Sequence, residues 1–139
     1  MFVDACAIVS VLTEEDTSPA YETELARASA PFTSSLAAWE AVMILARADK
    51  ADCGLTVALE IVLAWLDRNA IQLRELDRPR DLLAYAVAVA EKHGIGKRAL
   101  SNIDCFHYAH AKAAGAPLLT LDRLLRETDV ETLPVATTR

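Results

Sequence analysis

The sequence is poor in glycine, proline and cysteine, and each scarcity excludes a class of protein. With only 4 glycines and 5 prolines in 139 residues, it is neither collagen-like nor a flexible linker. The three cysteines, Cys6, Cys53 and Cys105, are odd in number and form no Cys-x-x-Cys or Cys/His zinc pattern. We therefore expect them to be reduced, buried thiols of a protein that resides in the cytoplasm.

Long apolar runs and an excess of positive charge are also absent. The longest uncharged apolar run, Leu82 to Ala90, is too short to cross a bilayer, and the first residues do not match a signal peptide. We therefore expect no membrane association. The net charge of −6 does not favour a nucleic-acid partner unless a local feature offsets the repulsion. The length suits a single domain spanning residues 1–139.

Short apolar segments alternate with helical patterns along the chain. The segments expected to form strands are residues 1–3, 32–33, 71–76, 117–120 and 130–133. The segments expected to form helices are residues 5–12, 19–30, 36–48, 55–68, 81–93 and 103–114, with a short helix or turn at 121–127. This alternation predicts an α/β fold with a parallel sheet covered by helices, in which functional residues gather at the carboxyl ends of the strands.

Four acidic residues lie in unusually apolar surroundings. Asp4 follows the first strand, and Asp122 follows the strand at 117–120. Asp104 lies in the first turn of the helix at 103–114. Glu40 lies inside an apolar helix and has no basic residue within one helical turn. A carboxylate in such surroundings is costly unless it is paired or bound to a metal.

Each of these acids has an alternative interpretation as a helix cap or as the partner of a basic residue. Taken together, they favour one acidic pocket in which a divalent cation offsets the mutual repulsion. Hard oxygen ligands without His or Cys point to Mg²⁺, with Mn²⁺ possible. Such a site suits phosphodiester hydrolysis and explains how a chain of negative net charge could hold a polyanion.

The order of the motifs resembles the PIN domain family, and within it most closely the VapC toxins of bacterial VapBC toxin–antitoxin pairs. The resemblance is carried by residues 3–9, 35–40, 104–109 and 115–122. It implies a three-layer α/β/α fold with a mostly parallel sheet, and a Mg²⁺-dependent endoribonuclease that acts as the toxin of a type II pair. It also implies a homodimer and inhibition by a VapB-like antitoxin. Asp4, Glu40 and Asp104 fall on the first three acids of the family, and Asp122 falls on the fourth, as catalytic and metal-binding residues.

Two departures from the family pattern motivate a second hypothesis. Cys6 stands where the family often has Ser, and a thiol is a poorer hydrogen-bond donor than a hydroxyl. Ile103 stands where Gly often precedes the third acid. The alternative is therefore a catalytically weak interaction module of the same fold. A phosphoryl-transfer receiver domain is disfavoured, because residues 120–126 contain no Lys.

Three other groups have both a functional and a structural interpretation. The basic residues that could dock RNA phosphates, or form a solvated loop, are Lys92, His93, Lys97 and Arg98. His107 and His110 lie three residues apart on one helix, where packing or surface exposure is favoured over a metal pair because no third ligand is evident. Trp39 and Trp65 are expected in the core or in a dimer interface.

Overall fold

A computed structural model describes residues 1–135 and confirms the α/β class. The strands are β1 (Phe2–Val3), β2 (Phe32–Thr33), β3 (Gln72–Leu73), β4 (Leu118–Leu119) and β5 (Thr132–Leu133). The helices are α1 (Ala5–Leu12), α2 (Ser18–Arg27), α3 (Ser35–Leu45), α4 (Leu55–Arg68), α5 (Pro79–His93), α6 (Asn102–Ala114) and α7 (Arg123–Arg126). Within residues 1–135, none of these helices combines the length and the apolar character needed to span a bilayer.

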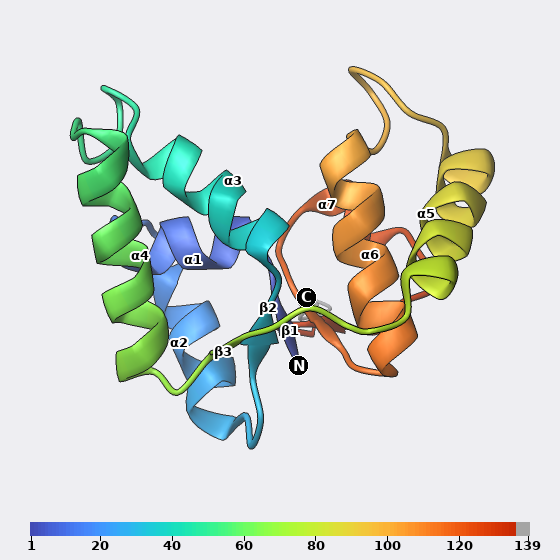
Figure 1. Cartoon of the computed structure of the whole chain (residues 1–139), viewed down its shortest axis with the longest axis horizontal. Helices are drawn as coiled ribbons and strands as arrows, with labels where there is room; N and C mark the ends of the chain where they lie inside the picture. The colour runs from blue at the N-terminus through green and yellow to red at the C-terminus, as the bar shows by residue number, and fades with distance from the viewer. Residues whose placement is uncertain (136–139) are drawn as a thin grey trace.

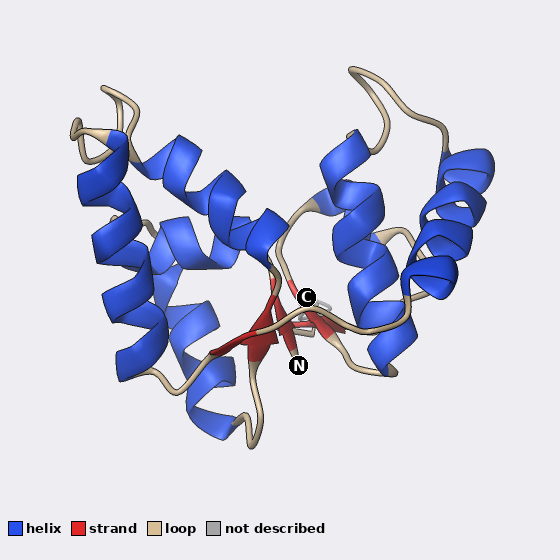
Figure 2. Cartoon of the chain, viewed as in Figure 1, coloured by secondary structure: helices blue, strands red, loops and turns tan. Residues whose placement is uncertain are grey.

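The five strands form one sheet in the order β3-β2-β1-β4-β5 (Figure 2). Every pair of neighbouring strands is parallel, so the sheet is more uniform than the mostly parallel one expected. In the centre, Phe2 of β1 is in register with Phe32 of β2 and with Leu118 of β4. Each strand is only two residues long, and the sheet therefore depends on the helices that cover it.

Helices cover both faces of the sheet, which gives three layers (Figure 1). Successive side chains of a strand point to opposite faces. Accordingly, Phe2 and Leu118 belong to the core beneath α5 and α6, whereas Val3 and Leu119 belong to the core shared with α1, α3 and α4. Each central strand thus contributes one buried side chain to each core.

Local signals fix the ends of the helices that matter for the site. The side chain of Ser34 accepts a hydrogen bond from the amide of Ala37 at 3.1 Å and begins α3. Ser101 begins α6 in the same way, as one half of a capping box. Gly115 ends α6 with φ 58°, a left-handed conformation that glycine adopts without steric cost.

The connections place a switch point beside β1. The chain runs from β1 outward through β2 to β3, and then crosses to β4 and β5 on the other side of β1. In such sheets the crevice at the carboxyl ends of the strands next to the switch point is the usual ligand site. Because α6 leads into β4 and runs back along the sheet, its N-terminal turns lie at the same edge, opposite the start of α3 (Figure 1).

Candidate metal centre

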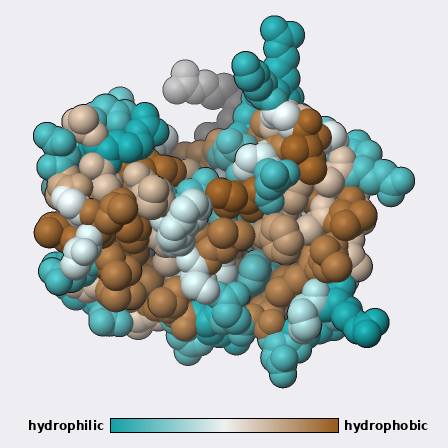
Figure 3. Space-filling view, turned by 45° about the horizontal axis from the view of Figure 1, so that its top comes forward, coloured by the Kyte–Doolittle hydropathy of each residue, from teal (hydrophilic) through white to brown (hydrophobic). Residues whose placement is uncertain are grey.

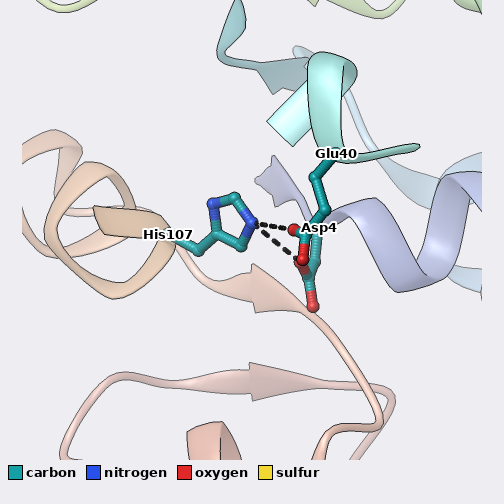
Figure 4. A group of neighbouring side chains, drawn as sticks. All are labelled: Asp4, Glu40 and His107. Atoms are coloured by element: carbon teal, nitrogen blue, oxygen red, sulfur yellow. Dashed lines mark hydrogen bonds and ion pairs between the residues drawn. The ribbon is translucent and has the colours of Figure 1, made fainter. Parts of the chain in front are cut away.

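Three side chains from three different elements meet at this edge of the sheet. Asp4 follows β1, Glu40 lies on α3 and His107 lies on α6 (Figure 4). One ligand atom from each lies within 4.8 Å of the other two. His107 Nε2 is 2.7 Å from Glu40 Oε2 and 3.5 Å from Asp4 Oδ1. The carboxylates therefore converge on the same point, with one imidazole nitrogen between them.

Asp4 is buried, and its carboxylate is held by side chains. Thr120 Oγ1 donates a hydrogen bond to Asp4 Oδ2 at 2.7 Å, and Cys6 Sγ donates to the same oxygen at 2.9 Å. Asp4 occupies the N-cap position of α1, yet its side chain makes no capping hydrogen bond. The residue has the position of a cap but its carboxylate is directed to the site.

His107 supplies the basic partner that Glu40 lacks on its own helix. Its side chain is fully buried. Burial lowers the pKa of His107, but the hydrogen bond to Glu40 and the charges of Asp4, Glu40 and Asp104 raise it above its usual value overall. Among the described residues, none forms a hydrogen bond with His107 Nδ1, which is buried. The imidazole is therefore polarised toward the two carboxylates.

The structure places Asp104 beside this trio but gives one of its oxygens a second role. Asp104 Oδ2 accepts a hydrogen bond from the amide of Ser101 at 2.8 Å and completes the capping box. Burial is the main cause that raises the pKa of Asp104, and the negative charge of Asp4 also raises it. Asp104 lies three residues before His107 on α6, and the two therefore share one face of the helix.

Asp122 is linked to the site only indirectly in this structure. Its Oδ1 accepts hydrogen bonds from the amides of Leu124 and Leu125 and caps α7. Its own amide donates to Thr120 Oγ1, which in turn donates to Asp4. The structure thus brings Asp4 and Glu40 together, while Asp104 and Asp122 lie outside the three-residue group, and the ligand roles of all four stay predictions.

His107 is a site residue that the sequence pattern does not indicate. The pattern favours packing or surface exposure for both histidines of α6, and His110 is indeed packed: its Nδ1 donates to the carbonyl of Phe106 at 2.8 Å and its ring stacks on Phe2. His107 is buried as well, but it contacts both acids. One usable signal was its spacing of three residues from Asp104, which places both on one face of a helix.

The thiols also differ from the expectation of three buried core cysteines. All three are free, as expected, and Cys105 is buried. Cys6 and Cys53 are partly exposed. The Cys6 thiol donates a hydrogen bond to Asp4, as a serine hydroxyl at this position could. The presence of Cys in place of Ser therefore does not remove a donor from the site.

The chemistry of this group fits a divalent cation. His107 offsets part of the repulsion between the carboxylates of Asp4 and Glu40, and a divalent cation would offset more of it. Asp4 Oδ1 and Glu40 Oε2 are hard oxygen donors of the kind that such cations prefer. The trio of Asp4, Glu40 and His107 could therefore hold a metal ion.

Comparison with known proteins supports the same interpretation. A search of curated proteins found no match to this chain. The family model described as PIN domain matches residues 1–131, which is nearly the whole chain. PIN domains are generally metal-dependent nucleases, which supports a hydrolase kind of activity here. The fold, the acidic convergence and this match agree, and the chain belongs to the PIN domain family.

Proposed function

We propose that this protein is a Mg²⁺-dependent endoribonuclease that hydrolyses RNA phosphodiester bonds. The observation that supports this most directly is the meeting of Asp4, Glu40 and His107 at the switch point of the sheet. Acidic side chains at this position, in a fold whose members are generally metal-dependent nucleases, favour a phosphodiester over other substrates.

In this proposal Asp4 Oδ1 and Glu40 Oε2 hold the ion, and Asp104 and Asp122 complete the site with the oxygens that their helix caps leave free. Mg²⁺ is the expected ion and Mn²⁺ a substitute. When bound, the ion supplies positive charge against the phosphodiester and makes water a stronger nucleophile. His107 Nε2 holds Glu40 Oε2 in place through the 2.7 Å hydrogen bond.

The RNA itself would meet the densest group of basic residues in the sequence. Lys92, Lys97 and Arg98 are exposed, at the end of α5 and in the loop that leads into α6. This loop leads directly into α6, the helix that carries Asp104 and His107. Phosphate contacts of this kind position a nucleic acid without reading its sequence.

RNA cleavage in three conditions tests the proposal. The wild-type protein is incubated with a mixed RNA substrate in Mg²⁺ and in EDTA, and Asp4→Ala is incubated in Mg²⁺. Asp67→Ala is the matched control, because Asp67 is an exposed acid on α4 and the substitution changes net charge equally. We expect RNA cleavage in only two samples, wild type in Mg²⁺ and Asp67→Ala in Mg²⁺. Equal cleavage in all samples would refute the assignment.

We further propose that the protein is the toxin of a type II pair in the cytoplasm, a homodimer inhibited by a VapB-like antitoxin. Exposed apolar side chains support a protein partner (Figure 3). Those on α3 and α4 are Trp39, Met43, Leu55, Val57, Leu59 and Leu63, and those on and after α5 are Leu83, Val87 and Ile95. Trp39 is 53% exposed, so of the two tryptophans only Trp65 is part of the core.

Two measurements test this second proposal. Light scattering on the purified chain gives its oligomeric state, and the expected mass is that of a dimer. Co-expression with the reading frame next to its gene is expected to yield a stable complex in which RNA cleavage is suppressed. A monomer with no such neighbour would contradict the toxin–antitoxin assignment. A stable complex without any cleavage by the free chain would instead favour the weakly catalytic interaction module.

A further inference from the structure

Two donors converge on a single oxygen of Asp4. Thr120 Oγ1 lies 2.7 Å from Oδ2, and Cys6 Sγ lies 2.9 Å from it. The other oxygen, Oδ1, faces His107 Nε2 at 3.5 Å. One oxygen is thus committed to the protein, and the other is directed into the metal centre. The donors to Oδ2 therefore determine the rotation of the carboxylate.

Cys6, one of these two donors, is oriented by Tyr21, a residue outside the site. The amide of Leu121 donates to the hydroxyl oxygen of Tyr21 at 2.9 Å. Since an amide can only donate, the hydrogen of the Tyr21 hydroxyl is free for Cys6 Sγ, which lies 3.3 Å away. The sulfur then has its own hydrogen available for Asp4 Oδ2. A directed chain of hydrogen bonds runs from α2 through α1 to the acid.

Thr120, the other donor, is oriented by the amide of Asp122, the residue that follows Leu121 in the chain. The amide of Asp122 donates to Thr120 Oγ1 at 3.1 Å, so the hydroxyl of Thr120 can donate to Asp4. Both chains begin at consecutive amides that follow β4 and end at one carboxylate oxygen. The turn at residues 121–122 is thereby connected to the orientation of Asp4.

The side chain of Tyr21 is held in place by packing as well as by its hydrogen bonds. Tyr21 is 2% exposed, and its ring packs in the core shared with α1. A phenylalanine at this position would keep the packing and remove only the hydroxyl.

We propose that Tyr21 is a positioning residue for Asp4, and that its hydroxyl acts through the Cys6 thiol to fix which carboxylate oxygen faces Glu40 and His107. The consequence for catalysis rests on the proposed nuclease function, but the positioning itself does not. A purely structural role for Tyr21 would affect stability and leave the carboxylate of Asp4 unchanged.

Four variants separate these roles. Tyr21→Phe removes the hydroxyl, Cys6→Ala removes the intermediate donor, and Cys6→Ser replaces it by a hydroxyl that can take its place. Tyr108→Phe is the matched control. The hydroxyl of Tyr108, another buried tyrosine, donates to the carboxylate of Asp129 at 2.7 Å, so Tyr108→Phe removes a hydrogen-bonded tyrosine hydroxyl that has no contact with Cys6 or Asp4.

The primary measurement is the carboxyl ¹³C resonance of Asp4, identified by its disappearance in Asp4→Asn. We expect it to move in Tyr21→Phe and in Cys6→Ala, to return toward the wild-type position in Cys6→Ser, and to stay in place in Tyr108→Phe. The second measurement is the dissociation constant for Mn²⁺ by calorimetry, expected to rise about five- to tenfold in Tyr21→Phe, as for one lost hydrogen bond.

An unchanged Asp4 resonance in Tyr21→Phe would overturn the proposal, and so would a shift of equal size in the Tyr108→Phe control. Urea unfolding of each variant verifies that the protein compared is folded. A wild-type protein that fails to cleave RNA, or to bind Mn²⁺, would contradict the proposed function. The Asp4 resonance would still decide the role of Tyr21 in that case, because it requires neither metal nor substrate.

Discussion

Asp4, Asp104 and Asp122 each stand at or near the start of a helix, and they use their carboxylates in two different ways. Asp104 and Asp122 accept hydrogen bonds from backbone amides at the start of their own helices, α6 and α7. Asp4 stands at the start of α1 and accepts from the side chains of Cys6 and Thr120 instead. Two carboxylates therefore serve local structure, whereas the third serves a site assembled by the whole fold.

This difference helps to distinguish a functional carboxylate from one that serves only as a helix cap. A capping side chain at a helix start stabilises the helix by about 1 kcal/mol, and α1 forgoes that contribution. Stability is thus given up locally so that one oxygen of Asp4 can face Glu40 and His107. An acid at a helix start that does not cap is a stronger candidate for function than an acid that does.

The largest expected effect is on the rate of RNA cleavage, and it separates Glu40, which caps no helix, from Asp122, which caps α7. Glu40→Gln removes a charge that no helix amide uses, and we expect RNA cleavage to fall about 1,000-fold, as for a lost metal ligand. Asp122→Asn keeps a capping oxygen, and we expect a fall of about tenfold, because this residue would only complete the site. Single-turnover cleavage at saturating Mg²⁺ measures both. Equal losses would remove the distinction between the two kinds of acid.

The next effect concerns the stability of the buried trio. His107→Ala leaves Asp4 and Glu40 without their positive partner, and we expect a loss of about 3 kcal/mol in the free energy of unfolding. Urea unfolding without divalent cations measures this loss. His93→Ala, at the end of α5, is the matched control and is expected to change the value by less than about 0.5 kcal/mol. A similarly small change in His107→Ala would show that the trio does not depend on the imidazole.

Much of the fold could be predicted from the sequence, because the signals involved are local. The helices at 5–12 and 55–68 have the predicted bounds. The parallel sheet followed from the alternation of elements, and its α/β class is confirmed. These features depend on residues within a few positions of one another.

The composition of the site was harder to predict, because it depends on distant contacts. Glu40 and His107 are 67 positions apart, and no local pattern indicates that they form a hydrogen bond. The use of Asp104 and Asp122 as caps is an alternative to metal binding in the sequence, and the structure shows that each cap uses a single oxygen, Oδ2 of Asp104 and Oδ1 of Asp122. The same side chain can therefore satisfy both interpretations.

A smaller effect tests the capping carboxylates alone. Asp122→Ala removes the acceptor for two amides of α7, and we expect a loss of about 1 kcal/mol in the free energy of unfolding, whereas Asp122→Asn retains an acceptor and loses only a few tenths. Urea unfolding of the two variants measures the difference. Indistinguishable stabilities would mean that the cap of α7 contributes nothing, and that Asp122 has only the role proposed for it in the site.

The smallest effect comes from a carboxylate that serves neither a helix start nor the metal centre. Tyr108 and Lys112 hold Asp129 at the surface, and the hydrogen bond from Tyr108 is the main cause that lowers its pKa from 3.8 to about 2. A lowered pKa in the folded state stabilises the protein above pH 3.8, and this contribution is lost as the pH falls through about 2. Because Asp129 is largely exposed, we expect the free energy of unfolding of wild type to exceed that of Asp129→Asn by less than about 1 kcal/mol at pH 6. Urea unfolding between pH 2 and 6 measures this difference, and one that stays constant over the whole range would contradict the assignment.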